Sequence, residues 1–143
     1  SNLTVRLSRG ERFAEASDML QRALRYVPEY VDARVALATL YLDEGRRMEA
    51  EEELRRALAT APGHAEGLAR LGQALWERDA LPEARDLLRR AVKVGSKDAS
   101  AHMLLGAVLV ESGEQDAAQK ALQTALWLEP GHAPAAYWLG RSY

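Results

Sequence analysis

Two histidines stand in identical surroundings and are the first residues whose chemistry needs an explanation. His64 and His132 each lie in the sequence "PGHA", at residues 62–65 and 130–133, and the offset between the copies is 130 − 62 = 68 in residue number. Imidazole nitrogens are common zinc ligands, and two histidines could share one metal ion if both came within about 2 Å of it. A turn that occurs twice in the chain is the other explanation. To choose between these two explanations, we need to know which secondary-structure elements contain the two copies and how far apart they lie.

Other catalytic chemistry has little support in the sequence. The chain has no cysteine, which excludes disulfides, thiol nucleophiles and thiolate metal ligands. The segment "GERFAEA" (10–16) lacks the Lys-Ser/Thr pair of a phosphate-binding loop. No serine carries a signature that would place it beside a base. We therefore expect no catalytic, cofactor-binding or metal site in this segment.

A regular period organises the chain. Pro28 and Pro62 differ by 62 − 28 = 34 in residue number, and Pro130 follows two such periods after Pro62. Further segments fall in the same frame: "QRAL" (21–24), "RRAL" (55–58), "RRAV" (89–92) and "QTAL" (123–126), together with "LG" at 71–72, 105–106 and 139–140. Such a period is the signature of a stacked repeat protein.

Within each period the apolar spacing is helical. Ala33, Leu37 and Tyr41 share one face of a first helix, and Ala50, Leu54 and Ala57 share one face of a second.

The ends of these helices also have sequence signals. Gly45 and Gly113 are expected to end first helices in the left-handed conformation that glycine adopts at little cost. Asp79 replaces this glycine in another repeat, and Pro82 is expected to open the helix after it. Pro62 and Pro130 are expected to follow the ends of second helices.

Each unit is thus a helix–turn–helix that buries its apolar faces by stacking on its neighbours. Two periods then separate His64 from His132 by four helices, or about 20 Å at ordinary helix spacing. No single metal ion spans that distance, so the sequence favours a repeated junction. His102 lies on the packing face of its helix, and we expect it to be partly buried.

The chain resembles the tetratricopeptide repeat family, over about residues 11–143. The match is clearest from "HMLLGAVL" (102–109) through "EP" (129–130), which carries the family's Leu-Gly pair, its small residues and its closing proline. The resemblance implies an all-α fold, a right-handed superhelical α-solenoid of stacked helix–turn–helix repeats. It also implies a non-catalytic scaffold for protein–protein interaction.

The period divides residues 1–143, taken as a single domain, into five parts. Residues 31–64, 65–98 and 99–132 are full repeats, residues 1–30 are a partial or atypical one, and residues 133–143 form a lone first helix or a cap. Ser1–Arg9 match the pattern poorly. We expect the chain to have been cut from a longer protein.

In this family, first helices line a concave groove, and helical spacing predicts which residues face it. The expected partner-binding groove is an exposed apolar strip with polar residues beside it. Its residues are Val35, Thr39, Leu42, Asp43, Ala69, Gln73, Trp76, Glu77, Met103, Val110, Glu111, Tyr137 and Arg141. The alternative for Trp76 is that its ring folds back onto its neighbours as packing.

One rim of the groove is acidic. Asp43, Glu77 and Glu111 recur at the repeat period, at the carboxyl ends of first helices, where a negative charge opposes the helix dipole. Either these acids serve a basic partner, or they pair with arginines close in the sequence, at positions 46, 47 and 78. The opposite face is basic, with arginines at positions 22, 55, 56, 89 and 90. We interpret it as a solvated surface, because it lacks the interleaved aromatics of a nucleic-acid site.

Composition narrows the class of protein further. The net charge is −2, hydrophobic residues make up 48% of the chain and charged residues 28%. We expect no membrane span and no general attraction to nucleic acid. The preference for Arg over Lys, with many alanines, favours a bacterial source. The sequence does not indicate a compartment.

The leading hypothesis is a scaffold that holds an apolar peptide or helix with Lys or Arg in its groove. The side chains that grip the carboxylate tails of heat-shock chaperones in one subclass are missing: the corresponding places hold Val35, Thr39, Arg70, Ser100 and Leu104. The alternatives are a regulatory or positioning segment of a larger bacterial enzyme or secretion assembly, and self-assembly through the terminal helices as a homo-oligomer.

Overall fold

The computed structural model describes residues 9–94 and 97–143, and the described part is all helical. Its eight helices are α1 (Arg9–Tyr26), α2 (Val31–Asp43), α3 (Arg47–Thr60), α4 (Ala65–Glu77), α5 (Leu81–Lys93), α6 (Ala99–Glu111), α7 (Gln115–Leu128) and α8 (Ala133–Arg141). The prediction of an all-α solenoid is confirmed. The poorly matching start of the chain, apart from Arg9, lies outside the described residues.

The helices follow the period of the sequence. Helices α2, α4, α6 and α8 begin at positions 31, 65, 99 and 133, a constant step that equals the sequence period (65 − 31 = 34). Helices α3, α5 and α7 begin at positions 47, 81 and 115, with the same step. Each pair of a first and a second helix is therefore built by the same stretch of the repeat.

The predicted turns are also present. Gly45 and Gly113 have φ of 76° and 81°, in the left-handed region. Asp79 has φ of 65° at the equivalent position, as expected from the alignment of the repeats. Pro82 lies in the first turn of α5, where its missing N–H leaves no helical hydrogen bond unmade.

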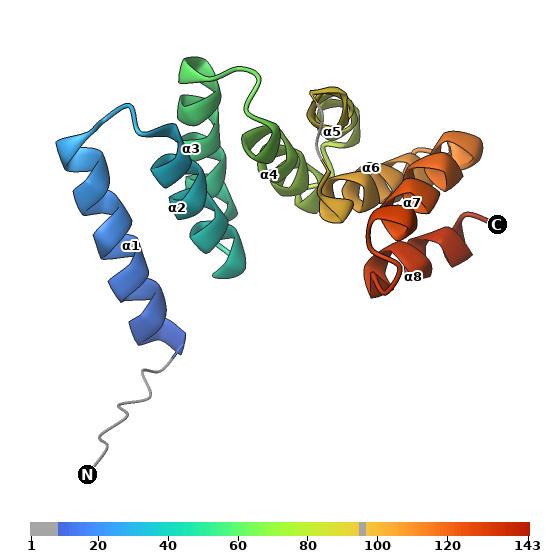
Figure 1. Cartoon of the computed structure of the whole chain (residues 1–143), viewed down its shortest axis with the longest axis horizontal. Helices are drawn as coiled ribbons and strands as arrows, with labels where there is room; N and C mark the ends of the chain where they lie inside the picture. The colour runs from blue at the N-terminus through green and yellow to red at the C-terminus, as the bar shows by residue number, and fades with distance from the viewer. Residues whose placement is uncertain (1–8, 95–96) are drawn as a thin grey trace, which may run out of the picture.

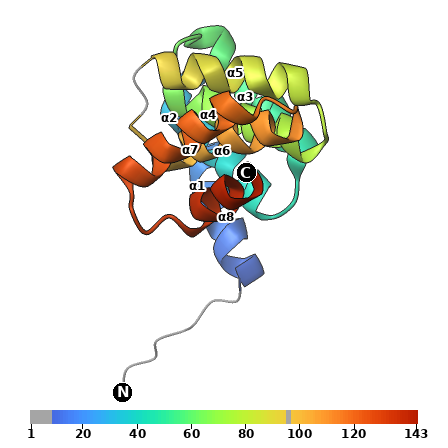
Figure 2. The same ribbon diagram turned by 90° about the vertical axis from the view of Figure 1, so that its right-hand side faces the viewer.

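The helices stack in chain order along the longest axis of the molecule, from α1 at one end to α7 and α8 at the other (Figure 1). Successive first helices also contact one another, α2 with α4, α4 with α6 and α6 with α8, so they form one continuous row. A view along the array shows α8 beside α6 and α7, with the C-terminus at its end (Figure 2).

The most extensive contacts join the two helices of one repeat. They rest on a large side chain of the second helix seated on a residue with little or no side chain in the first. A Cβ atom added to Gly72 would lie 2.6 Å from Cγ of Leu88. A Cβ on Gly106 would meet Leu122 in the same way. In the first full repeat, Leu54 stands at the position of Leu88, and Ala38 stands at the position of Gly72.

The core consists of columns of equivalent residues. Second helices contribute the columns Ala50, Ala84 and Ala118; Leu54, Leu88 and Leu122; and Ala57, Ala91 and Ala125, all at most 1% exposed. First helices contribute Leu37, Leu71 and Leu105, which are at most 7% exposed. The repeat period thus fixes the core.

We expect Gly72→Ala to destabilise the fold although alanine is the better helix former. The added methyl overlaps Leu88, and overpacking of this kind costs about 1–3 kcal/mol. Gly140 is the matched control, because it occupies the same position of the repeat in α8 and a Cβ there meets nothing within 4 Å. Urea unfolding of dilute protein compares the two, and equal effects of Gly72→Ala and Gly140→Ala would contradict this packing.

Candidate functional site

The repeated "PGHA" sequence forms the start of a helix. Nδ1 of His64 accepts a hydrogen bond from the backbone N–H of Gly67 at 2.9 Å, and so caps the N-terminus of α4. Nδ1 of His132 accepts from Ala135 N–H at 3.2 Å and caps α8. In this tautomer Nε2 of His64 donates to Asp32 at 2.9 Å. Both rings therefore have a structural role, because each pairs a backbone N–H that the helix leaves without an acceptor.

The predicted exposed strip is wrong at three of its residues. Val35, Ala69 and Leu42 are 1%, 3% and 8% exposed. Neighbouring first helices approach closely enough to cover them: a Cβ on Gly67 of α4 would lie 3.5 Å from Cγ2 of Val35 in α2. Helical spacing placed these residues toward the row of first helices but did not reveal the contact that buries them.

Three aromatic rings meet on the first helices near the C-terminal end of the array. We call Trp76, Tyr137 and Trp138 the aromatic cluster. The ring centroids of Trp76 in α4 and Trp138 in α8 are 5.7 Å apart in an edge-to-face arrangement. Tyr137 contacts Trp138 at 5.5 Å, also edge to face. This geometry is the one that aromatic quadrupoles favour.

The contact between Trp76 and Trp138 spans α6, which lies between α4 and α8 in the row. On α6, Met103 and Val110 are half-buried and pack against both hydrophobic clusters of the molecule. Side chains two repeats apart can meet in this way only on the inner side of a curved row. The aromatic cluster therefore marks the concave side of the array.

Trp76 both packs on its neighbours and borders the groove. Its ring is partly buried against the core, and its indole N–H donates to the carboxylate of Glu111 at 2.7 Å. The alternative in which Trp76 serves as packing thus has structural support, although part of the ring remains accessible.

A guanidinium group lies against two rings of the aromatic cluster. The Cζ atom of Arg141 lies 5.1 Å from the ring centroid of Trp138 and 5.9 Å from that of Tyr137. These are cation–π distances, and Arg141 and Tyr137 are both exposed. The structure thus brings Trp76, Glu111, Tyr137 and Arg141 of the predicted groove together, and adds Trp138.

The three recurrent acids, Asp43, Glu77 and Glu111, are all exposed, and we call them the acidic column. Two of their carboxylates accept hydrogen bonds from neutral groups. Gln73 donates to Glu77 at 3.3 Å, and Trp76 donates to Glu111. Asp43 lies farther along the row, where Arg9 donates to its backbone carbonyl at 3.5 Å.

The arginines that could neutralise the acidic column are engaged elsewhere. Arg46 pairs with Glu49 at 2.9 Å and lies over the rings of Phe13 and Tyr41. Arg47 donates to the backbone carbonyl of Glu77 and not to its carboxylate. Arg78 pairs with Glu51 at 2.9 Å, and the hydrogen bond to this carboxylate raises the pKa of Arg78.

Two polar members of the predicted groove use their hydrogen bonds within their own helices. The hydroxyl of Thr39 donates to the carbonyl of Val35 at 3.0 Å, and Gln73 accepts from Arg70 at 2.9 Å. Both residues are half-buried. Part of their hydrogen-bonding capacity is therefore used within the protein.

Most arginines of the basic face are paired with acids, whereas Arg90 donates to the backbone carbonyl of Pro62 at 3.3 Å. Arg55 contacts Glu83 at 2.8 Å, Arg56 contacts Glu52 at 2.8 Å, and Arg89 contacts Glu114 at 3.4 Å. Arg22 contacts Asp18 at 3.1 Å in the same manner. This pairing supports the interpretation of a solvated surface.

Neither a metal centre nor a membrane-spanning helix is found in the described part of the chain. Within residues 9–94 and 97–143, no three His, Asp or Glu side chains are placed to hold a metal ion together. Among the helices of the same residues, none has the length and apolar character needed to cross a membrane.

Trp138 was not among the predicted groove residues. It occupies the repeat position of Leu104, which is 3% exposed, and of Arg70, which is half-buried. Because residues at this repeat position face inward, the repeat alignment could have indicated that Trp138 lies in the site.

A curved row of first helices backed by second helices defines a helical repeat protein of the interaction-scaffold class. Two family models, both described as tetratricopeptide repeat, match the sequence, one over residues 35–102 and 71–118 and the other over residues 9–57. The chain belongs to the tetratricopeptide repeat family. No curated protein matches its sequence.

Solved structures share this fold. The chain is similar to MamA with a TM-score of 0.78 and 27% identity, over 97% of this chain and 85% of MamA. It is similar to YrrB, a tetratricopeptide repeat protein described with an unusual peptide-binding site, with a TM-score of 0.74, 24% identity and coverage of 92% and 68%. The O-GlcNAc transferase of Thermobaculum terrenum, in a mutant form, matches with a TM-score of 0.74 and 33% identity over 78% of this chain and 22% of the transferase.

The capping histidines lead to a prediction about stability. We expect His64→Ala to lower the free energy of unfolding by about 1 kcal/mol, because the N–H of Gly67 loses its acceptor. His64→Asn should retain most of the stability, since asparagine is a favoured N-cap. Chemical unfolding of the two variants tests this, and an equal loss in both would mean that the cap is not what His64 contributes.

The aromatic cluster leads to a prediction about fluorescence. In a Trp127→Phe background both Trp138→Phe and Trp138→Ala leave Trp76 as the single tryptophan, and we expect its fluorescence to lie at longer wavelength in the Trp138→Ala variant, because water reaches the exposed ring edge. The loss of the aromatic pair should cost about 0.5–1.5 kcal/mol beyond the lost burial. The control is Tyr26→Ala, at an 88% exposed ring on α1. Unchanged Trp76 emission would show that the two rings do not meet in solution.

Proposed function

We propose that the concave side of the array binds an apolar peptide or partner helix whose lysines or arginines meet the aromatic cluster and the acidic column. The observation that carries the proposal is the position of Arg141. A guanidinium already lies against Trp138 and Tyr137, next to the carboxylate of Glu111 that holds Trp76. The rings thus already accommodate a planar guanidinium group.

Arg141 is exposed and belongs to the last turn of α8, so its displacement by a partner's cation requires little rearrangement. An arriving Lys or Arg gains the same ring faces and can also reach the acids.

Burial and charge both support this partner. Trp76, Met103 and Val110 are partly exposed apolar residues at the centre of the row, and tryptophan is among the residues most enriched at interface hot spots. Arginines 46, 47 and 78 contact other groups and not the carboxylates of the acidic column. Charges at the rim of an interface govern association rate and partner choice more than affinity.

Other functions receive less support. The residues at the positions of a chaperone carboxylate clamp include Val35, which is buried, and Thr39, whose hydroxyl is already used. A nucleic-acid partner would have to break the arginine–carboxylate pairs of the second helices. We propose that this segment acts by binding and performs no catalysis.

A peptide-display selection on the 143-residue chain tests the function. We expect selected peptides to combine apolar residues with Lys or Arg. The triple variant Asp43→Lys, Glu77→Lys, Glu111→Lys should slow their association by about tenfold or more at low salt, because it replaces attraction with repulsion. The matched control is the triple variant Glu52→Lys, Asp86→Lys, Asp116→Lys, which makes the same change in net charge at exposed acids of α3, α5 and α7.

The association rates are measured by stopped-flow fluorescence at two salt concentrations, with circular dichroism of each variant as the check on folding. Equal slowing by the control triple variant would mean that only overall charge matters. Selected peptides without basic residues, or faster association with the triple variant, would overturn the proposed partner.

A second candidate is a positioning segment of a larger bacterial enzyme. The likeness to the O-GlcNAc transferase favours it, because the matching part is only 22% of that protein. The open reading frame that encodes this chain discriminates the two: a fused catalytic domain supports the second candidate, and its absence from the frame removes it.

A further inference from the structure

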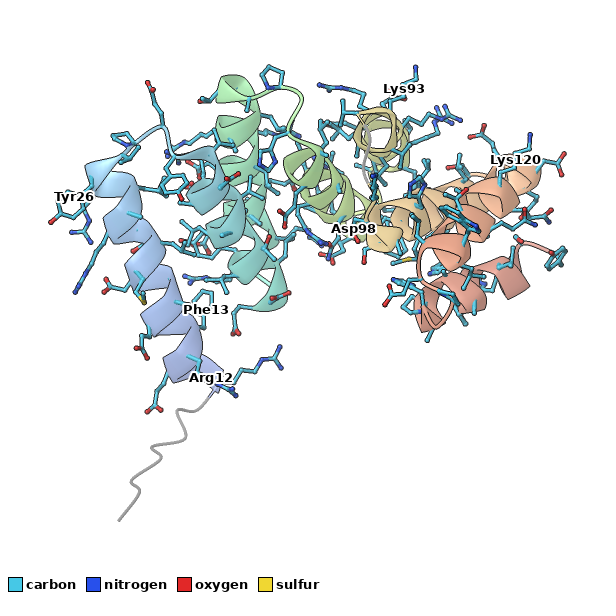
Figure 3. The ribbon with its side chains drawn as sticks, in the orientation of Figure 1. Arg12, Phe13, Tyr26, Lys93, Asp98 and Lys120 are labelled. Atoms are coloured by element: carbon cyan, nitrogen blue, oxygen red, sulfur yellow. The ribbon has the colours of Figure 1, made fainter. Side chains whose placement is uncertain are left out.

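The residue that precedes a first helix differs in its chemistry along the array. Positions 64, 98 and 132 are equivalent in the repeat and hold histidine, aspartate and histidine. His64 and His132 each cap their helix through Nδ1, which accepts a backbone N–H. Asp98 caps α6 through its carboxylate, which accepts from the N–H of Ser100 at 2.9 Å. Figure 3 shows Asp98 at the start of α6. Two of these three caps thus depend on an imidazole nitrogen.

An imidazole cap forms only while its ring is neutral. An Nδ1 atom that carries a proton is a donor, and it cannot accept the N–H of the helix. The N–H of Gly67 or Ala135 would then lose its acceptor, and a positive ring would face the positive end of the helix dipole. In model peptides imidazole takes up this proton at about pH 6.5, whereas aspartate stays charged down to about pH 4. Mild acid should therefore act on the two histidine caps and leave the aspartate cap in place.

An acid beside His64 offsets this loss. Oδ1 of Asp32, in the first turn of α2, lies 2.9 Å from Nε2 of His64. A protonated ring keeps this contact and gains an ion pair with the carboxylate. Glu66 adds a negative charge in the first turn of α4, and Arg90 of α5 donates to a backbone carbonyl of the same turn. On α3, Arg56 pairs with acids of its own helix. Asp32 is thus the group that compensates a charge on His64.

His132 has weaker compensation. Its nearest acid is Glu129, whose Oε2 lies 3.9 Å from Nε2 and whose side chain is 62% exposed, so water screens much of the attraction. Ser100 of α6 stands at the position of Asp32, two periods on, and has no charge. The side chain of His132 is only 10% exposed, so water solvates a charge on this ring poorly. Protonation of His132 therefore removes a cap and gives little in return.

The other charged groups of the helices packed here stand farther along them. Asp116 and Lys120 lie in the first half of α7, away from the end that leads into this turn. Glu111 and Arg141 lie in the last turns of α6 and α8. His102 lies in the first turn of α6 and titrates in the same range as the caps. Since every variant below retains His102, its protonation cancels in the comparisons.

The two helices with histidine caps are also the helices that carry the aromatic cluster. Trp76 belongs to α4, and Tyr137 and Trp138 belong to α8. Trp76 and Trp138 meet across α6 with ring centroids 5.7 Å apart. Helix α6, which has the aspartate cap, contributes no ring to the cluster. A change at the start of α8 therefore acts on two of the three rings and not on Trp76.

We propose that mild acid uncaps α8 by protonating His132 and thereby loosens the aromatic cluster, while Asp32 preserves the start of α4. Neutral pH then holds the rings together, and acid separates the rings of α8 from that of Trp76. This inference goes beyond the proposed function and does not depend on it, because the caps and rings of the chain itself carry it without a partner.

Urea unfolding at about pH 7.5 and about pH 5, on either side of the imidazole titration, tests the caps. Acidification should lower the folding equilibrium constant of the wild type about fivefold more than that of His132→Asn, the effect of one lost cap, because asparagine caps at both pH values. The matched variant His64→Asn should respond to acid nearly as the wild type does. Equal responses of the wild type and His132→Asn would overturn the proposal, and so would a larger effect of His64→Asn than of His132→Asn.

Removal of the compensating acid provides a second test. Asp32→Asn should make the chain more sensitive to acid than the wild type, because a protonated His64 then loses its cap without gaining an ion pair. The double variant Asp32→Asn, His64→Asn should lose this extra sensitivity, which would assign it to the ring. An Asp32→Asn chain that responds to acid no more than the wild type would contradict the difference proposed between the two caps.

Nitrogen resonances of the ¹⁵N-labelled chain connect the cap to the rings. Nδ1 of His132 should be unprotonated at about pH 7.5 and protonated at about pH 5. The same acidification should shift the indole resonances of Trp76 and Trp138 in the wild type, and shift them less in His132→Asn. Trp127, which is 81% exposed and outside the cluster, is the internal control. Both chains retain Glu111, so its titration does not produce the difference. Indole resonances that respond equally in both chains would overturn the link between cap and cluster.

Discussion

The close approach of the two helices of one repeat is the contact on which the rest of the structure depends. Leu88 lies so close to α4 that Gly72 has no room for a side chain, and Leu122 and Gly106 repeat the arrangement one period later. This contact between leucine and glycine sets the distance between the two helices, and that distance determines how deeply the surrounding core residues are buried. Since the same contact recurs with the repeat, it also fixes how each repeat is turned on the next.

Curvature of the array follows from that stacking, and it creates the candidate site. Trp76 and Trp138 belong to first helices that are not neighbours, yet their rings meet above α6. The rings are held by packing, by the bond from Trp76 to Glu111 and by Arg141. The same interactions that stabilise the cluster leave one apolar edge and the exposed residues Glu77 and Glu111 beside it. The residues that stabilise the cluster therefore also belong to the proposed binding site.

The period, the helices and their ends could be predicted from the sequence because they depend on local spacing and on single residues. Asp79 could be assigned to a left-handed turn only because Gly45 and Gly113 stand at the equivalent positions. The turns at His64 and His132 were visible in the sequence, whereas the caps needed coordinates.

The groove was predicted less well, because its shape depends on contacts between repeats. Helical spacing shows which face Val35 and Ala69 occupy, but not that the next first helix covers them. The meeting of Trp76 with Trp138 depends on curvature summed over two repeats, which no local pattern contains.

The claim that the concave side binds a basic apolar peptide is tested most directly by the three indole N–H resonances of the ¹⁵N-labelled chain. Trp76 and Trp138 belong to the aromatic cluster, and Trp127 lies on α7, 81% exposed and outside the cluster. Titration with a selected peptide should shift the resonances of Trp76 and Trp138 and leave that of Trp127 in place. A shift of Trp127 alone, with the other two unchanged, would contradict the account.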